Sequence, residues 1–118
     1  LKRKHVRIEL DQEDKAVAII YADLKEDASI ISGKILDISL GGIKVEISGK
    51  HTDLFKENQI IPRCQLKLKG FMVRTQAKIA KKEDNLLGIS FIDILDDDVK
   101  KIAYFIHQKL KIIVKNQL

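Results

Sequence analysis

Short runs of alternating apolar and polar residues occupy most of the chain. Val17–Tyr21 is rich in residues that favour strands, and the run Ile43–Ile47 is apolar at every odd position. A period of two is what a strand with one buried face requires. Gly41-Gly42 and Gly49 bound the second of these runs. We therefore expect short strands joined by tight turns.

The same alternation continues through the middle of the chain. Cys64, Leu66 and Leu68 share one predicted face, and Gly70 occupies a hairpin turn before the next run. A loop that ends at Pro62 precedes them. The predicted strands fall in the ranges 17–21, 35–38, 43–47, 64–68, 71–79 and 87–91. That spacing is typical of a β-barrel or sandwich.

The last segment changes to a helical period. Its apolar residues recur at steps of three and four, at Val99, Ile102, Ile106, Leu110 and Ile113. Asp96, Asp97 and Asp98 precede this stripe. At the start of a helix they can cap exposed N–H groups and oppose the helix dipole, which explains them better than a metal site does. Tyr104, Phe105 and Ile112 widen the apolar surface. Extra core contact and a partner helix both explain this width, and the second predicts a homodimer through the C-terminal helix.

Composition fits one globular domain of 118 residues, with 45% apolar and 33% charged residues. The net charge of +5 permits an anionic partner, but the lysines are spread along the chain, as on a solvated surface. Aromatic residues make up only 5% and tryptophan is missing, so a base-stacking surface for nucleic acid is not expected.

Cys64 is the single cysteine, which excludes an internal disulfide and suits a reducing compartment. The sequence has no signal peptide and no apolar run long enough to span a bilayer. We therefore expect a cytoplasmic bacterial protein. Because the chain starts at Leu1 rather than Met, we also expect it to be part of a longer polypeptide.

Two small polar clusters are candidates for ligand binding. Arg3 and Arg7 are four residues apart, or about 13 Å in an extended chain, and could clamp one anionic ligand. The second cluster is the segment 37–42, Asp-Ile-Ser-Leu-Gly-Gly. If Leu36, Ile38 and Leu40 point into a barrel, Asp37 and Ser39 share its outer face. The two glycines would permit positive φ and the close approach of a flat ligand.

Taken together and in this order, the two clusters resemble the two-part motif of PilZ domains, Arg-x-x-x-Arg followed by Asp/Asn-x-Ser-x-x-Gly. Gly33–Ile43 is similar to the central hairpin of that family, and Gly88–Phe91 to a later strand with Gly-x-x-Phe. The resemblance implies a mainly β fold, a six-stranded antiparallel β-barrel with a C-terminal α-helix. The whole chain, 1–118, would be one domain, with an arm over 1–10, a barrel over 15–93 and a helix over 96–115.

The resemblance also implies a ligand, the bacterial second messenger cyclic di-GMP (c-di-GMP), and no other cofactor. Arg3 and Arg7 would bond the O6 and N7 atoms of guanine and the phosphates, which suits the planar guanidinium fork. Asp37 would accept from guanine N1 and N2, Ser39 would bond the base or a phosphate, and Gly42 would leave room for the ring. The candidate site extends to Lys2, Lys4 and Gly41. The extra charge at Lys2 predicts a stacked pair of ligands, which a stoichiometry near one would reject.

An enzyme is not expected. His5, His51 and His107 show no metal-ligand spacing with each other or with Cys64, and no nucleophile elbow or phosphate loop is present, so we assign no catalytic and no metal-binding residue. Ligand binding would order the N-terminal arm and reposition a protein partner or an adjoining domain. Two alternatives are a PilZ-like interaction module that binds no nucleotide and a basic barrel that binds nucleic acid.

Overall fold

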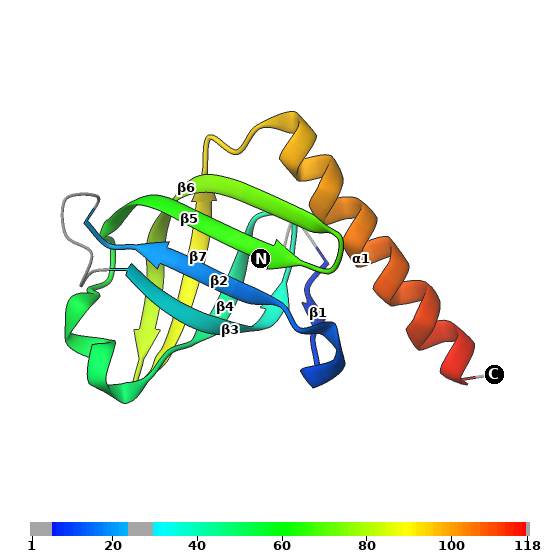
Figure 1. Cartoon of the computed structure of the whole chain (residues 1–118), viewed down its shortest axis with the longest axis horizontal. Coiled ribbons are helices and arrows are strands. Elements are labelled where there is room, and N and C mark those ends of the chain that lie inside the picture. Colours follow the sequence, from blue (N-terminus) through cyan, green and yellow to red (C-terminus); the bar gives the residue numbers. More distant parts are fainter. Residues whose placement is uncertain (1–5, 24–29, 118) are drawn as a thin grey trace.

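The computed structural model describes residues 6–23 and 30–117, so Lys2, Arg3 and Lys4 of the predicted site lie outside the described residues. Most of the described chain is in antiparallel strands (Figure 1). The strands are β1 (Ile8–Glu9), β2 (Val17–Tyr21), β3 (Ile30–Ile38), β4 (Gly42–Glu46), β5 (Ile60–Leu68), β6 (Phe71–Glu83) and β7 (Leu86–Ile92). Two short 3-10 helices, η1 (Gln12–Asp14) and η3 (Gly49–Leu54), and one long helix, α1 (Asp96–Gln117), complete the fold.

The strands close into a barrel. Their order is β1-β3-β2-β5-β6-β7-β4, and an additional pairing between β3 and β4 joins the two sides. Six strands, β2 to β7, form the ring, while β1 pairs with the end of β3 that extends beyond Val17, the first residue of β2. This arrangement confirms the predicted six-stranded antiparallel barrel with a C-terminal helix.

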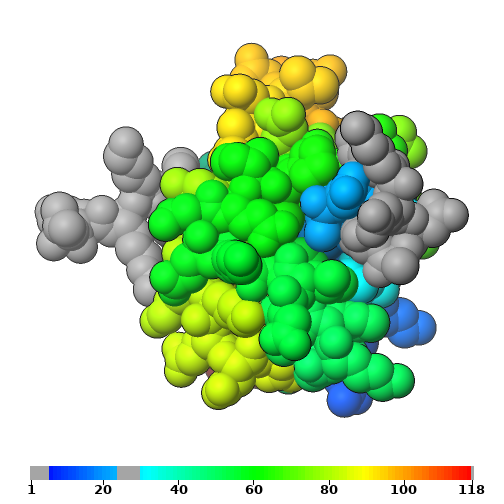
Figure 2. Space-filling model, turned by 90° about the vertical axis from the view of Figure 1, so that its left-hand side faces the viewer, coloured from blue at the N-terminus to red at the C-terminus, as the bar shows by residue number. Residues whose placement is uncertain are grey.

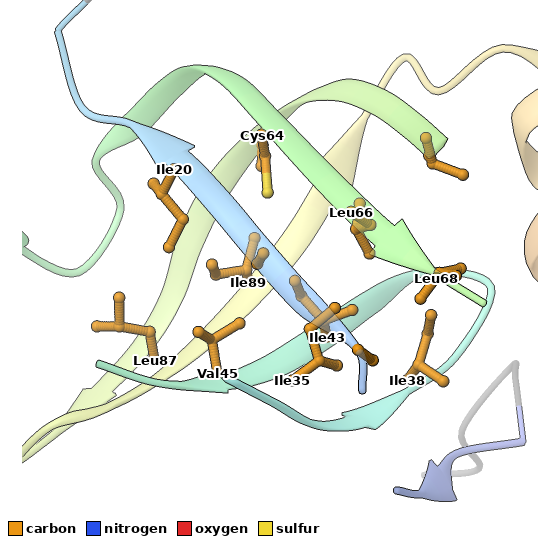
Figure 3. Close-up of a cluster of buried hydrophobic side chains, with 14 of the residues drawn as sticks. Ile20, Ile35, Ile38, Ile43, Val45, Cys64, Leu66, Leu68, Leu87 and Ile89 are labelled. Carbon is orange, nitrogen blue, oxygen red and sulfur yellow. The ribbon is translucent and has the colours of Figure 1, made fainter. Parts of the chain in front are cut away.

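The barrel interior is packed with aliphatic side chains, and Figure 3 shows those of β2, β3, β4, β5 and β7 pointing toward one another. The predicted alternation is confirmed in β5, where Cys64, Leu66 and Leu68 are buried. Gly70 makes the predicted hairpin turn with a φ of 84°, a conformation that glycine adopts without steric cost. Burial of these apolar faces is the main stabilising term of the fold.

One end of the barrel is covered by the segment that contains η3. Phe55, the residue after η3, is fully buried beneath it, and Figure 2 shows the green atoms of this part of the chain filling the surface at that end. The prediction of a loop up to Pro62 was wrong, because β5 already starts at Ile60. Pro62 lies at a register shift between Ile61 and Cys64, a place where a strand tolerates a residue without an N–H group.

Helix α1 packs on the barrel mainly through its first half, and Ile113 adds a partly buried contact further along. Ile102, Phe105 and Ile106 are buried, and the ring of Tyr104 meets Phe71 edge-on at 5.5 Å. Leu110, which we predicted on the buried stripe, is 37% exposed because the helix continues past the barrel (Figure 1). Among the described residues, no helix combines the length and the apolar character needed to cross a membrane.

Candidate ligand-binding site

A β-bulge in β3 places Asp37 on the outer face of the barrel. Ile35 pairs with Val45 and Asp37 pairs with Lys44, so Leu36 is an extra residue in this strand. Without it, the alternation set by the buried Ile35 would turn Asp37 into the core. The prediction that Leu36 points into the barrel was therefore wrong, since this side chain is only half-buried on the outside.

Arg7 and Asp37 form an ion pair on this face. The Arg7 Nη1 donates to Oδ1 of Asp37, although the two residues are 30 positions apart in the chain. The side chain of Asp37 is 14% exposed and that of Arg7 is 34% exposed, so water screens this pair less than one on the open surface. The N-terminal arm and the β3 motif therefore meet at one place.

Ser39 shapes the turn between β3 and β4. Its hydroxyl oxygen accepts from the N–H groups of Gly41 and Gly42, both at 3.2 Å, and the hydroxyl is 3.4 Å from the carbonyl oxygen of Gly42. The residue is only 4% exposed, which differs from the outward position we predicted for it. Leu40, predicted to point inward, is half-buried and packs against the core. The hydrogen bonds from these two N–H groups explain why the serine side chain turns back onto its own loop.

Gly42 is needed for the approach of two strands. A Cβ atom at this position would lie 2.2 Å from the carbonyl oxygen of Ile89 in β7, a distance that no real contact allows. Its backbone has no positive φ, and the residue is buried. The space that we expected Gly42 to leave for a ligand ring is thus occupied by the protein backbone.

A pocket of about 590 Å³ lies over these residues. It is lined by Arg7, Asp37, Ser39, Gly41, Ile43, Lys44, Ala80, Lys81, Glu83, Leu86, Gly88, Ile89 and Ser90. Asp37 and Ser39 both border this pocket, although the Ser39 hydroxyl is turned onto its own loop. Sequence reasoning missed the lining residues from β6 and β7, because only cross-strand pairing brings them to the motif.

Neither a metal-ligand cluster nor a reactive thiol lies among the described residues. No three His, Cys, Asp or Glu side chains of these residues are close enough together to hold a metal ion. Burial raises the pKa of the Cys64 thiol to about 12, so the thiolate that a nucleophilic cysteine needs does not form near neutral pH. The pocket lining holds both cations, Arg7, Lys44 and Lys81, and carboxylates, Asp37 and Glu83.

The family model of the PilZ domain matches residues 1–108. Together with the closed barrel and the pocket at its motif, this match shows that the chain belongs to the PilZ domain family. No curated protein matches the chain in sequence.

Solved structures share this fold at low identity. The PilZ domain of YcgR from Escherichia coli, solved with c-di-GMP, has a TM-score of 0.76 and 11% identity, covering 99% of this chain and 98% of that one. MrkH from K. pneumonia in complex with c-di-GMP has a TM-score of 0.78 and 16% identity, over 100% of this chain and 55% of that one. The MotI inhibitor of motility from Bacillus subtilis has a TM-score of 0.72 and 18% identity, over 94% and 52%. This chain spans 49% of the longer YcgR chain.

Proposed function

We propose that this domain is a receptor for c-di-GMP with no catalytic activity of its own. The observation that carries the proposal is the Arg7–Asp37 ion pair at the rim of the outer pocket. It joins a cation and an anion from the two halves of the PilZ motif at one pocket. The YcgR and MrkH structures, both solved with c-di-GMP, support the choice of ligand.

In this proposal, residues of opposite charge contact different groups of the ligand. Arg7, with Arg3 from the arm, donates to the O6 and N7 acceptors of guanine and to phosphate oxygens, for which the guanidinium fork is suited. Asp37 has a second carboxylate oxygen for the N–H donors of guanine. Ser39 holds the turn that presents Gly41 to the pocket. Charge-assisted hydrogen bonds contribute about 1.5–3 kcal/mol each, so a few of them support a micromolar site.

In this proposal, a polar contact between η1 and α1 carries the signal from the arm to the C-terminal helix. The Lys109 Nζ on α1 lies 3.1 Å from a carboxylate oxygen of Asp11 and 2.9 Å from one of Asp14. Asp14 is the last residue of η1, and Asp11 caps this helix by accepting from the N–H groups of Glu13 and Asp14. We propose that ligand binding orders the arm and β1, and that η1 and Lys109 pass this change to α1.

The exposed apolar side chains of α1 are the surfaces that we assign to output. Tyr104 and Ile112 lie on one side of the helix and Leu110 and Val114 on another, and all but Leu110 are more than half exposed. A protein partner, an adjoining domain or a second copy of the chain would cover these side chains. Sedimentation velocity with and without c-di-GMP distinguishes a homodimer from a monomer that awaits another partner.

A thermal-shift experiment tests the proposal. A ligand that binds only the folded state at about 100 times its Kd stabilises it by about 2.7 kcal/mol. For a domain of this size we expect c-di-GMP to raise Tm by roughly 8–15 °C, and GTP to leave it unchanged. An unchanged Tm with c-di-GMP at every concentration would favour the interaction module that binds no nucleotide. A rise with any polyanion, abolished by salt, would favour the nucleic-acid-binding alternative.

A further inference from the structure

Four residues of the pocket form one row across neighbouring strands. Asp37 of β3 pairs with Lys44 of β4, Lys44 pairs with Gly88 of β7, and Gly88 pairs with Lys81 of β6. Residues directly opposite each other in antiparallel strands project from the same face. All four border the pocket, so the row runs along its floor on the outside of the barrel.

A second bulge brings Lys81 into this row. Ile79 pairs with Ile89 and Lys81 pairs with Gly88, which leaves Ala80 as an extra residue in β6. Ile79 is fully buried, and strict alternation would send Lys81 to the same inner face. The bulge instead turns Lys81 to the outer face, and its side chain is 73% exposed. Both ends of the row, Asp37 and Lys81, are thus turned outward by a local break in strand pairing.

Gly88 makes a trough between two lysines. It is the only member of the row without a side chain, and its two direct neighbours are Lys44 and Lys81. Since adjacent strands lie about 4.8 Å apart, the Cα atoms of the two lysines are about 10 Å apart. A Cβ atom placed on Gly88 would lie 3.4 Å from the Cβ of Lys81, an ordinary contact. The barrel therefore accepts alanine here, and folding alone does not require glycine.

The charges of this trough are available to a ligand. Lys44 is exposed and has no ion pair among the described residues, whereas Arg7 is already paired with Asp37. Lys81 is 3.6 Å from Glu83, and because both side chains are about two-thirds exposed or more, this pair is weak and easily opened. The pocket therefore holds two cations that neither half of the PilZ motif supplies.

We infer that Lys44 and Lys81 bind the phosphates of the cyclic dinucleotide and that Gly88 forms the floor beneath its ring. This inference rests on the proposed function. The compact ammonium group of a lysine suits a phosphate oxygen. One lysine lies on each side of Gly88, which has no side chain, and this arrangement suits a flat ligand with a phosphate on each side. Asp37, at the end of the row beside Lys44, stays available for the guanine donors.

Calorimetric titration of c-di-GMP into the parent and four variants tests this inference. The variants are Lys44→Ala, Lys81→Ala and Gly88→Ala, with Lys67→Ala as the matched control. Lys67 is an exposed lysine of β5 that does not border the pocket. We expect each of the three pocket variants to bind about tenfold more weakly at low salt and the control to bind like the parent. The two lysine variants should also show a weaker dependence of Kd on salt than the parent, because each has lost a phosphate contact.

The outcomes separate the two claims. Parent-like affinity and salt dependence in the lysine variants, alongside weak binding by Arg7→Ala, would overturn this inference and leave the receptor function intact. Parent-like affinity of Gly88→Ala would overturn the role of the floor. If the folded parent itself binds no c-di-GMP, the receptor function and this inference both fail. Far-ultraviolet circular dichroism and the Tm of each variant exclude loss of folding as the cause of weak binding.

Discussion

The guanidinium of Arg7 donates to the carboxylate of Asp37, and this contact joins the N-terminal arm to the bulged strand β3. In the absence of ligand, each residue neutralises the other at the pocket rim. A guanine base has hydrogen-bond acceptors on one edge and donors on another. Such a ligand can bond the remaining N–H groups of Arg7 and the second carboxylate oxygen of Asp37, so that neither charge is left unpaired. In the receptor that we propose, this pair supplies both the cation and the anion that such a ligand contacts.

Replacing either member of this pair should weaken ligand binding. We expect Asp37→Ala and Arg7→Ala each to cost about 2–3 kcal/mol of binding free energy, the range of one or two charge-assisted hydrogen bonds. Isothermal calorimetry measures the effect, with Lys67→Ala as a control for a change of surface charge. Variants that bind as tightly as the parent would refute the assignment of these residues to the site.

Ser39 should matter for folding as much as for binding. Removal of its hydroxyl leaves the N–H groups of Gly41 and Gly42 without their acceptor, so we expect Ser39→Ala to lower the free energy of unfolding by about 1–3 kcal/mol. Urea denaturation reports this loss. Ser32, an exposed serine of the same strand, provides the control, and Ser32→Ala should change stability by less than about 0.5 kcal/mol. Equal effects of the two substitutions would contradict the structural role of Ser39.

Gly42→Ala should damage the barrel directly. The new methyl group would meet the carbonyl oxygen of Ile89 at 2.2 Å, and β4 would have to move away from β7. We expect a loss of about 3 kcal/mol in unfolding free energy, at the upper end of the range for overpacked cores. Gly49 has nothing within 4 Å of its missing Cβ and no positive φ, so Gly49→Ala should be close to neutral. A stable Gly42→Ala protein would show that the strand contact is not needed.

The sequence predicts the barrel well because most of its strands alternate cleanly, as in the run from Phe71 to Ile79. It predicts the positions of Arg7 and Asp37 through the motif. It does not reveal the two bulges, because Leu36 and Ala80 are unremarkable residues whose effect depends on register with a neighbouring strand. For that reason the outward position of Lys81 could not be derived from a period of two.

The contact between η1 and α1 should depend on Lys109. The hydrogen bond to Asp14 is the largest cause of the raised pKa of Lys109, and the hydrogen bond from Lys109 lowers the pKa of Asp11 below its usual 3.8. The contribution of Asp11 to stability is therefore complete above that pH and is lost as the pH falls through the lower value of the folded state. We expect Lys109→Gln to leave c-di-GMP affinity nearly unchanged but to abolish ligand-dependent protection of α1 amides from hydrogen exchange. Protection equal to that of the parent would contradict the relay through Lys109.

Cys64 should be unreactive in the folded protein. Its thiol is fully buried and burial raises its pKa to about 12, so both access and thiolate are lacking at pH 8. We expect a disulfide reagent such as DTNB to label no thiol in the native protein and one thiol per chain in denaturant. Fast labelling of the native protein would show that β5 opens or that its inner face is not the one containing Cys64.

Calorimetric titration of the parent chain with c-di-GMP, with GTP and cyclic GMP as controls, tests the central claim most directly. We predict saturable binding of c-di-GMP with a Kd in the micromolar range or tighter, about −8 kcal/mol or more favourable, and no saturable binding of the two controls. A stoichiometry near two would support the stacked pair predicted from Lys2, and a value near one would reject it. No binding of c-di-GMP by the folded chain, or equal binding of GTP, would contradict the receptor function.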